Sequence, residues 1–182
     1  MLQGRMHPSS KEGLMLQVPK RYGGVARRDE RGASAVEFAI IISLLFIVLF
    51  GIIQFGIAFN RYQSVNAAAR EGARIASLTN TQVDQIQDRV LESLSILNPA
   101  SFKNGGARIY TCPVSLGVEK GCIEVLQQGS GTPMTNGAAT PCDPAHQNQT
   151  VTVRVKFKML ITIPLWSSPA VNTTGSGVFR CE

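Results

Sequence analysis

The sequence predicts an α+β protein in which one long N-terminal helix lies half in a membrane and half against a small, disulfide-bonded antiparallel sheet. Three observations support this prediction. An apolar run extends to Phe59, with no charged residue between Phe38 and Ile53. Apolar and polar residues alternate strictly over residues 150–163. All four cysteines lie after residue 111, in the part of the chain that follows the apolar run.

The apolar run is long enough to cross a lipid bilayer. As a helix, residues 33–59 would rise about 40 Å at ~1.5 Å per residue, and a hydrocarbon core is ~30 Å thick. A helix in the core of a soluble domain would keep a polar face, and this run has none for about four turns. Residues 33–59 are therefore predicted to span the membrane once.

Positive charge is concentrated before the apolar run, at Lys20, Arg21, Arg27, Arg28 and Arg31. Lys and Arg are retained on the cytoplasmic side of a membrane. Residues 1–32 are thus expected to form a basic cytoplasmic leader, and the chain after about residue 60 to be exported. The net charge of +6 could also indicate nucleic acid. Because much of the excess precedes residue 32, we interpret it as a topology signal and expect no nucleic-acid partner.

Two simpler interpretations compete for this segment. A secretory signal peptide has an apolar core of ~7–15 residues and small residues after it, but here the core is longer and the small residues 32–35 precede it. An uncleaved signal anchor is harder to exclude. Glu37 argues against it, because a carboxylate at the edge of an apolar helix is costly without a partner.

Residues 32–38 read Gly-Ala-Ser-Ala-Val-Glu-Phe and resemble the processing motif of type IV prepilins, a glycine followed by four residues and then Glu-Phe. The longer run 32–77, with the segments 50–56 and 67–74, resembles the TadE-like pseudopilins of the tight-adherence (Flp, type IVb) pilus system. That family often has Glu where this chain has Gln54, so no mid-helix charge is expected here. The resemblance implies a pilin-like fold and a structural protein rather than an enzyme.

The resemblance also implies a role for each residue of the motif. A prepilin peptidase, which is a membrane-embedded aspartyl protease, would cut between Gly32 and Ala33 and remove the leader. Glu37, followed by Phe38, would then be the fifth residue of the mature chain and would pair with the new amino group of a neighbouring subunit. A carboxylate and an ammonium group are each costly alone in an apolar setting and tolerable together. Snorkelling of Glu37 to the interface, or stabilisation of its own helix N-terminus, is the competing interpretation.

The expected partners are therefore the prepilin peptidase, other pilins or pseudopilins, pilus assembly proteins and the membrane. The expected location is the bacterial cytoplasmic (inner) membrane, as a single-pass protein with its N-terminus in the cytoplasm, and by extension a surface pilus. The alternative function is that of an uncleaved, signal-anchored extracytoplasmic binding or adhesion protein.

The exported part is predicted to begin with a continuation of the first helix over residues 60–79. Its apolar face, Tyr62, Val65, Ala69, Gly72 and Ala76, needs a cover. Arg70, Glu71 and Arg74 lie on another face, which we interpret as solvated, with a role in subunit contacts as the alternative.

Residues 80–182 are predicted to form the exported α+β domain. Thr81 is a candidate N-cap for a short helix that ends at Asn98-Pro99. Its apolar stripe would be Val83, Ile86, Val90, Leu94 and Leu97. Residues 107–111, 122–126, 150–163 and 178–181 are expected strands, and residues 127–149 and 165–174 are expected loops. The strand over 150–163 would place Arg154, Lys156 and Lys158 on a solvated face, with binding of an acidic partner as the alternative.

The cysteines Cys112, Cys122, Cys142 and Cys181 suit an oxidising compartment and two disulfides. Three pairings are possible, and we favour Cys112–Cys122 and Cys142–Cys181. A zinc site is disfavoured, because no CxxC pair exists and the nearby histidine is His146 alone. No catalytic motif is visible, so no catalytic residue, metal or cofactor is predicted.

Overall fold

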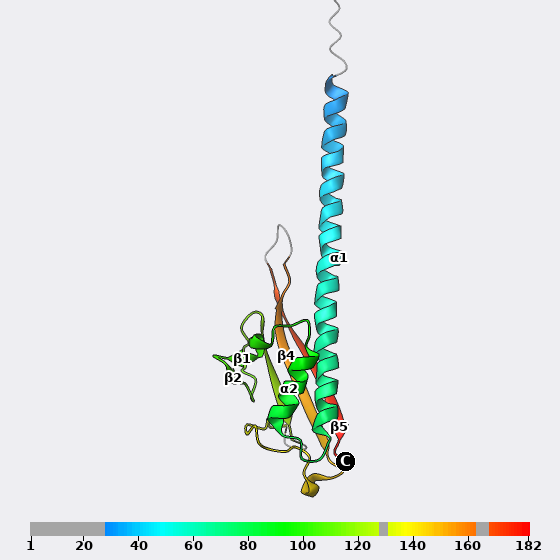
Figure 1. Ribbon diagram of the computed structural model, residues 1–182. Helices are drawn as coiled ribbons and strands as arrows, with labels where there is room; N and C mark the ends of the chain where they lie inside the picture. The colour runs from blue at the N-terminus through cyan, green and yellow to red at the C-terminus, as the bar shows by residue number, and fades with distance from the viewer. Residues whose placement is uncertain (1–27, 128–130, 163–167) are drawn as a thin grey trace, which may run out of the picture. The chain divides into compact units, whose positions relative to one another are not determined.

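The computed structural model describes residues 28–127, 131–162 and 168–182, with side chains from residue 32 onward (Figure 1). The leader cations Lys20, Arg21 and Arg27 lie outside the described residues. The elements are, in order, α1 Arg28–Ala76, α2 Val83–Ser93, η1 Pro99–Phe102, β1 Lys103–Asn104, β2 Ala107–Arg108, β3 Lys120–Leu126, η2 Pro144–His146, β4 Thr150–Leu160 and β5 Ala170–Arg180. The predicted α+β class with a long N-terminal helix, an antiparallel sheet and two disulfides is confirmed.

The chain forms two compact units, Met1–Ile42 and Ser43–Glu182. In the first unit the described residues belong to α1 alone. This helix begins at Arg28, before the predicted start at Ala33, and ends at Ala76 rather than near Thr79. The second unit contains the rest of α1 and every other element, and it holds the core.

Three antiparallel strands in the order β3-β4-β5 make the main sheet. The alternation predicted for β4 is confirmed, because Val151, Val153, Val155, Phe157 and Met159 are all buried. The expected strand over 107–111 is shorter than predicted and does not pair with the strand over 122–126. Residues 107–108 pair instead with β1 in a small hairpin, and β3 pairs with β4. The last strand begins at Ala170, well before the predicted residue 178.

Two helices cover the inner face of the sheet. The end of α1 contributes Val65, Ala68, Ala69, Ala73 and Ala76 to the core. Tyr62, which was also expected on the covered face, is exposed. The stripe predicted for the second helix is also buried: Val83, Ile86, Val90, Leu94 and Leu97. The helix itself, however, stops at Ser93, and its N-cap is Gln82 rather than Thr81. The Gln82 N–H donates to the Gln85 side chain at 3.1 Å.

Two glycines of β5 allow the backbone of α1 to lie directly against the sheet. A Cβ added to Gly175 would lie 2.7 Å from the Val65 carbonyl oxygen and 2.9 Å from the Asn66 Cα, and one added to Gly177 would overlap the Ala69 carbonyl. Two residues along β5 thus correspond to four along α1. These steps match at about 3.3 Å per strand residue and 1.5 Å per helix residue, so β5 runs parallel to α1, as Figure 1 shows.

Both favoured disulfides are present. Cys112 bonds to Cys122, and Cys142 bonds to Cys181. The second bridge fixes the C-terminus beside the end of α1, where the Glu182 N–H donates to the Ser77 carbonyl at 3.2 Å. The Asn80 N–H donates to the Cys142 carbonyl at 3.2 Å. The end of the long helix, the long loop and the last strand are therefore held together at one end of the domain.

Candidate functional site

The residues of the predicted processing motif all lie on α1. Gly32, Ala33, Glu37 and Phe38 are exposed. Ala33 and Glu37 are one turn apart on the same helix face, since side chains at i and i+4 are neighbours. Glu37 forms no ion pair with any residue that the structure describes.

Apart from the half-buried Gln54 and Ala58 near its end, the apolar run of α1 has no cover in the second unit. Every large apolar residue from Leu44 to Phe59 is between 41% and 72% exposed. An amphipathic helix of a soluble domain would bury one face, whereas here all faces are exposed. Residues 32–76 contain the one candidate membrane span among the described residues. Apolar surface of this extent requires lipid or neighbouring apolar helices around it.

The outer face of the main sheet carries the predicted basic residues, but a buried carboxylate lies among them. The Glu124 side chain on β3 is only 5% exposed. It accepts a hydrogen bond from the Cys112 N–H at 2.8 Å and lies 3.4 Å from Lys156 Nζ and 3.7 Å from Arg154 Nη1. Within the described part of the chain, its Oε2 accepts no hydrogen bond. From the sequence we expected a basic, solvated face and missed Glu124. The feature that could have revealed it is a carboxylate in the middle of a short, otherwise apolar strand.

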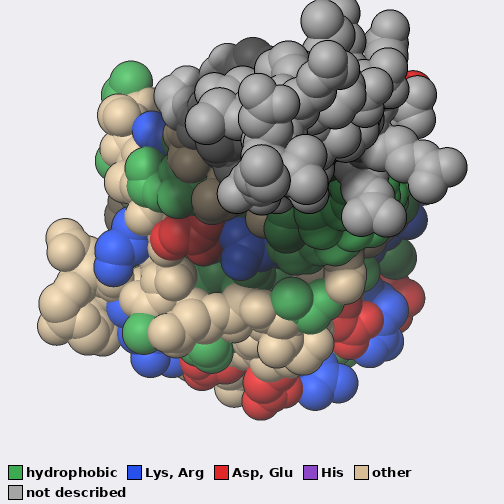
Figure 2. All heavy atoms as spheres, turned by 90° about the horizontal axis from the view of Figure 1, so that it is seen from above, with side chains coloured by type: hydrophobic (Ala, Val, Ile, Leu, Met, Phe, Trp, Pro, Cys, Tyr) green, Lys and Arg blue, Asp and Glu red, His purple; other side chains and the backbone are tan. Residues whose placement is uncertain are grey.

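A hollow of about 380 Å³ lies on this outer face, between the 112–116 loop and the strands β4 and β5. Lys156, Lys158, Asn172 and Thr174 line its sheet side. Its sheet side is polar and basic, whereas its loop side includes Pro113, Val114 and Leu116. Figure 2, which looks down on the molecule, shows Lys and Arg side chains interspersed with Asp and Glu on the face in view.

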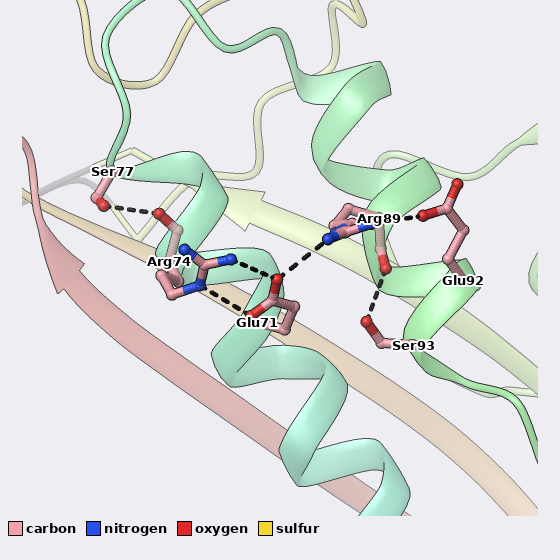
Figure 3. A network of polar contacts seen from close by, with 6 residues as sticks. All are labelled: Glu71, Arg74, Ser77, Arg89, Glu92 and Ser93. Atoms are coloured by element: carbon pink, nitrogen blue, oxygen red, sulfur yellow. Dashed lines mark hydrogen bonds and ion pairs between the residues drawn. The ribbon is translucent and has the colours of Figure 1, made fainter.

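The face predicted to be solvated on α1 carries a polar network that reaches α2 (Figure 3). Arg74 donates to both carboxylate oxygens of Glu71, at 2.8 and 2.9 Å. Glu71 also lies 3.5 Å from the Arg89 guanidinium, which donates to Glu92 at 3.0 Å. The hydrogen bonds from Arg74 hold the pKa of the Glu71 carboxyl below its ordinary value. These side chains are exposed, so each pair is worth under about 1 kcal/mol. The network therefore connects α1 and α2 but adds little to the stability of the fold.

His146 is placed by its own loop and belongs to no triad or metal cluster among the described residues. Its Nδ1 contacts the Asp143 carboxylate, and its Nε2 lies 3.4 Å from Gln127 Nε2. The contact with His146 lowers the pKa of Asp143. Because all four cysteines are in disulfides, they offer no thiolate to a metal.

Comparison with known proteins singles out the N-terminal part of the chain. Residues 32–74 match the family described as TadE-like protein. This segment is TadE-like. No curated protein and no solved structure matches the chain. The TadE-like segment covers the motif, the apolar run and the core-facing part of α1, up to Arg74 in the network with Glu71.

The matched segment coincides with the exposed apolar part of α1, which is long and apolar enough to cross a membrane once. The matched segment ends before α2, so the sheet domain lies outside the family match.

Proposed function

We propose that the protein is a minor pseudopilin, stored in the bacterial cytoplasmic membrane, cut after Gly32 by a prepilin peptidase and used in assembling tight-adherence pili. Residues 1–32 are the cytoplasmic leader, and residues 33–59 span the membrane. Residues 60–79 continue the helix outside it, and residues 80–182 form the extracytoplasmic domain. The observation that carries the proposal is the start of the TadE-like match at residue 32, the last residue before the bond to be cut.

The environment of Gly32 suits a glycine that is required by a binding partner and not by packing within the chain. A Cβ added there would meet nothing within 4 Å, so packing within the described residues does not require glycine. Glycine costs about 1 kcal/mol relative to alanine inside a helix, and the bond after it lies within α1. A peptidase must unwind the helix to reach that bond, and a glycine makes unwinding easier.

The exposed apolar surface supports storage and extraction of the subunit. In lipid this surface is solvated by hydrocarbon, and in a fibre it would be covered by the helices of neighbouring subunits. The exposed Glu37 carboxylate would then accept the ammonium group of a neighbour's Ala33. The pair supplies a register, because a buried charge without its partner costs about 3–5 kcal/mol.

The processing step is tested by mass spectrometry of the protein extracted from membranes. The mature chain is expected to begin at Ala33, and the Gly32→Val variant to retain the leader. Gly51→Val is the matched control, since a Cβ at Gly51 also meets nothing within 4 Å; this variant should still be cut. If the native protein begins upstream of Gly32, the processing proposal is wrong, and the uncleaved signal-anchored binding or adhesion protein becomes the better assignment.

The assembly role of Glu37 is tested separately from processing. The Glu37→Ala variant should still be cut, but its amount in sheared pili should fall by more than about tenfold, given the cost of an unpaired buried charge. Glu92→Ala removes another exposed carboxylate, 67% exposed and far along the chain, and should be incorporated normally. Equal incorporation of both variants would contradict the pairing of Glu37 with a neighbouring amine.

A further inference from the structure

The end of the β4–β5 hairpin departs from the pattern of the rest of the sheet. Along the outer face of β4 the side chains are Thr152, Arg154, Lys156 and Lys158, and the next outward position is Leu160. Leu160 is 38% exposed, and Val171, on the other face of β5, is 40% exposed. The polar outer face of β4 thus becomes apolar at this end, which we call the hairpin end and define as Leu160, Ile161, Ala170 and Val171.

The hairpin end lies beside the apolar run of α1, as the register of β5 against the helix indicates. Gly175 faces Val65 and Asn66, and β5 runs parallel to α1. Val171 precedes Gly175 by about 13 Å of strand, which corresponds to about nine helix residues. Val171 is therefore level with about Ile57.

Leu160 pairs with Ala170 in the sheet, one strand residue further along. The same conversion places this pair level with about Gln54. The burial of α1 agrees with this placement. Gln54 and Ala58 are half-buried, while the other residues from Gly51 to Asn60 are exposed. Ala58 packs against the core cluster.

Charged groups lie at the level where the apolar run ends. Lys158 pairs with Asn172, which the same conversion places level with about Phe59, and Lys120 lies across the sheet from Lys158. Cationic side chains at this depth suit the phosphate groups of lipids. Next to them, Arg61 donates to Glu119 at 3.0 Å, and Glu119 accepts from the Leu160 N–H at 2.9 Å. These two bonds tie the hairpin end to the first charged residue after the apolar run.

We propose that the hairpin end is a second membrane contact, seated in the interface of the leaflet that surrounds the C-terminal end of the α1 span, with Lys120 and Lys158 at its anionic head groups. The proposal rests on the membrane span of α1 and goes beyond it. This contact sets the orientation of the sheet domain on the bilayer. The first residues of β5 touch the lipid, so the domain is not held away from the membrane by α1 alone. Two contacts hold the domain in one orientation, where a single helix would leave it free to tilt.

The test places an environment-sensitive fluorophore at single introduced cysteines of the full chain, reconstituted in phosphatidylethanolamine and phosphatidylglycerol vesicles. The four native cysteines form two disulfides and do not compete for the label. Val171→Cys reports on the hairpin end. Val178→Cys is the matched control on the same strand, 58% exposed and, at about 10 Å beyond Gly175, far from the apolar run. Ile52→Cys, 67% exposed on α1, reports on the span itself.

The labels at Val171 and Ile52 should emit further to the blue than the label at Val178 and should be quenched by brominated lipid tails. Lipid at Ile52 but water at both strand positions would overturn the proposal and leave the membrane span intact. Water at Ile52 would overturn both. When vesicles of phosphatidylcholine alone replace the anionic vesicles, quenching of the Val171 label should weaken in the protein that keeps both lysines. It should change less in the Lys120→Gln/Lys158→Gln variant. An equal change in both proteins would show that Lys120 and Lys158 do not contact anionic head groups.

Discussion

The close approach of α1 to β5 makes Gly175→Ala a sensitive probe of the fold. The added methyl group would lie 2.7 Å from the Val65 carbonyl oxygen and 2.9 Å from the Asn66 Cα. Both neighbours are helix backbone, so neither can rotate away, and the helix must lift from the sheet. Overpacking of this kind costs about 1–3 kcal/mol. Alanine also reduces the conformational freedom of the unfolded chain, which stabilises the fold by about 0.4–1 kcal/mol. The free energy of unfolding should therefore fall by a net amount of about 1.5 kcal/mol.

The assay is thermal unfolding of the full chain in detergent micelles, without reductant, followed by near-UV circular dichroism. At roughly 4 °C per kcal/mol, the unfolding temperature of Gly175→Ala should fall by about 6 °C. Ser176→Val is the matched control, because Ser176 lies between the two glycines and is exposed; its unfolding temperature should change by less than about 2 °C. Gly175→Ala combined with Gly177→Ala should cost less than the sum, because the first change already lifts the helix.

If Gly175→Ala unfolds at the same temperature as the parent protein, the helix backbone does not lie against β5, and the register that places the hairpin end beside residues 54–57 fails with it. If Ser176→Val is destabilised equally, the effect belongs to the strand in general and not to the contact with α1.

Two further predictions concern the covalent and ionic links of the domain. Replacing both cysteines of the Cys142–Cys181 bridge by serine should cost about 4 kcal/mol, against about 3 kcal/mol for the Cys112–Cys122 bridge, because loop-closure entropy grows with the number of residues enclosed; these separations are 39 and 10 residues. The same thermal assay ranks the two, and the reverse order would contradict the entropic reasoning. The second prediction concerns Glu71, whose pKa is lowered in the folded protein by Arg74. A lowered folded-state pKa means that the stabilisation is fully present above the unfolded-state pKa and is lost as the pH falls through the folded-state value. The difference in unfolding temperature between the parent protein and Glu71→Gln should therefore shrink on acidification below about pH 4.3 and in high salt, and a difference that is constant across this range would remove the ion pair as its cause.

Much of the fold was predictable from local pattern. The alternation over residues 150–163 correctly predicted the buried face of β4, because successive strand residues point to opposite faces. The spacing of Val83, Ile86 and Val90 predicted a buried helix stripe. The helix ends were less accurate: α2 stops at Ser93, since the stripe continues through a turn that still buries Leu94.

The strand predictions failed where a distant partner decides the structure. The sequence predicts a loop over residues 165–174 and a last strand only from residue 178, after Gly175 and Gly177. In the structure both glycines lie within an 11-residue strand. A glycine in a strand often marks close approach of another backbone, but the sequence does not say which backbone approaches. Glu124 was missed for the same reason, because its partners Arg154 and Lys156 come from the neighbouring strand.

By itself, the sequence predicted the long apolar helix, the motif over residues 32–38 and the alternation of β4, because each depends on residues that are neighbours along one helix or one strand. Only the tertiary structure decided that β5 runs along α1, that Glu71 reaches Arg89 of the second helix, and that the hairpin end is level with the apolar run. Those features depend on the distance between elements far apart in the chain. That distance is set by how closely two backbones can approach, which two glycines on β5 permit.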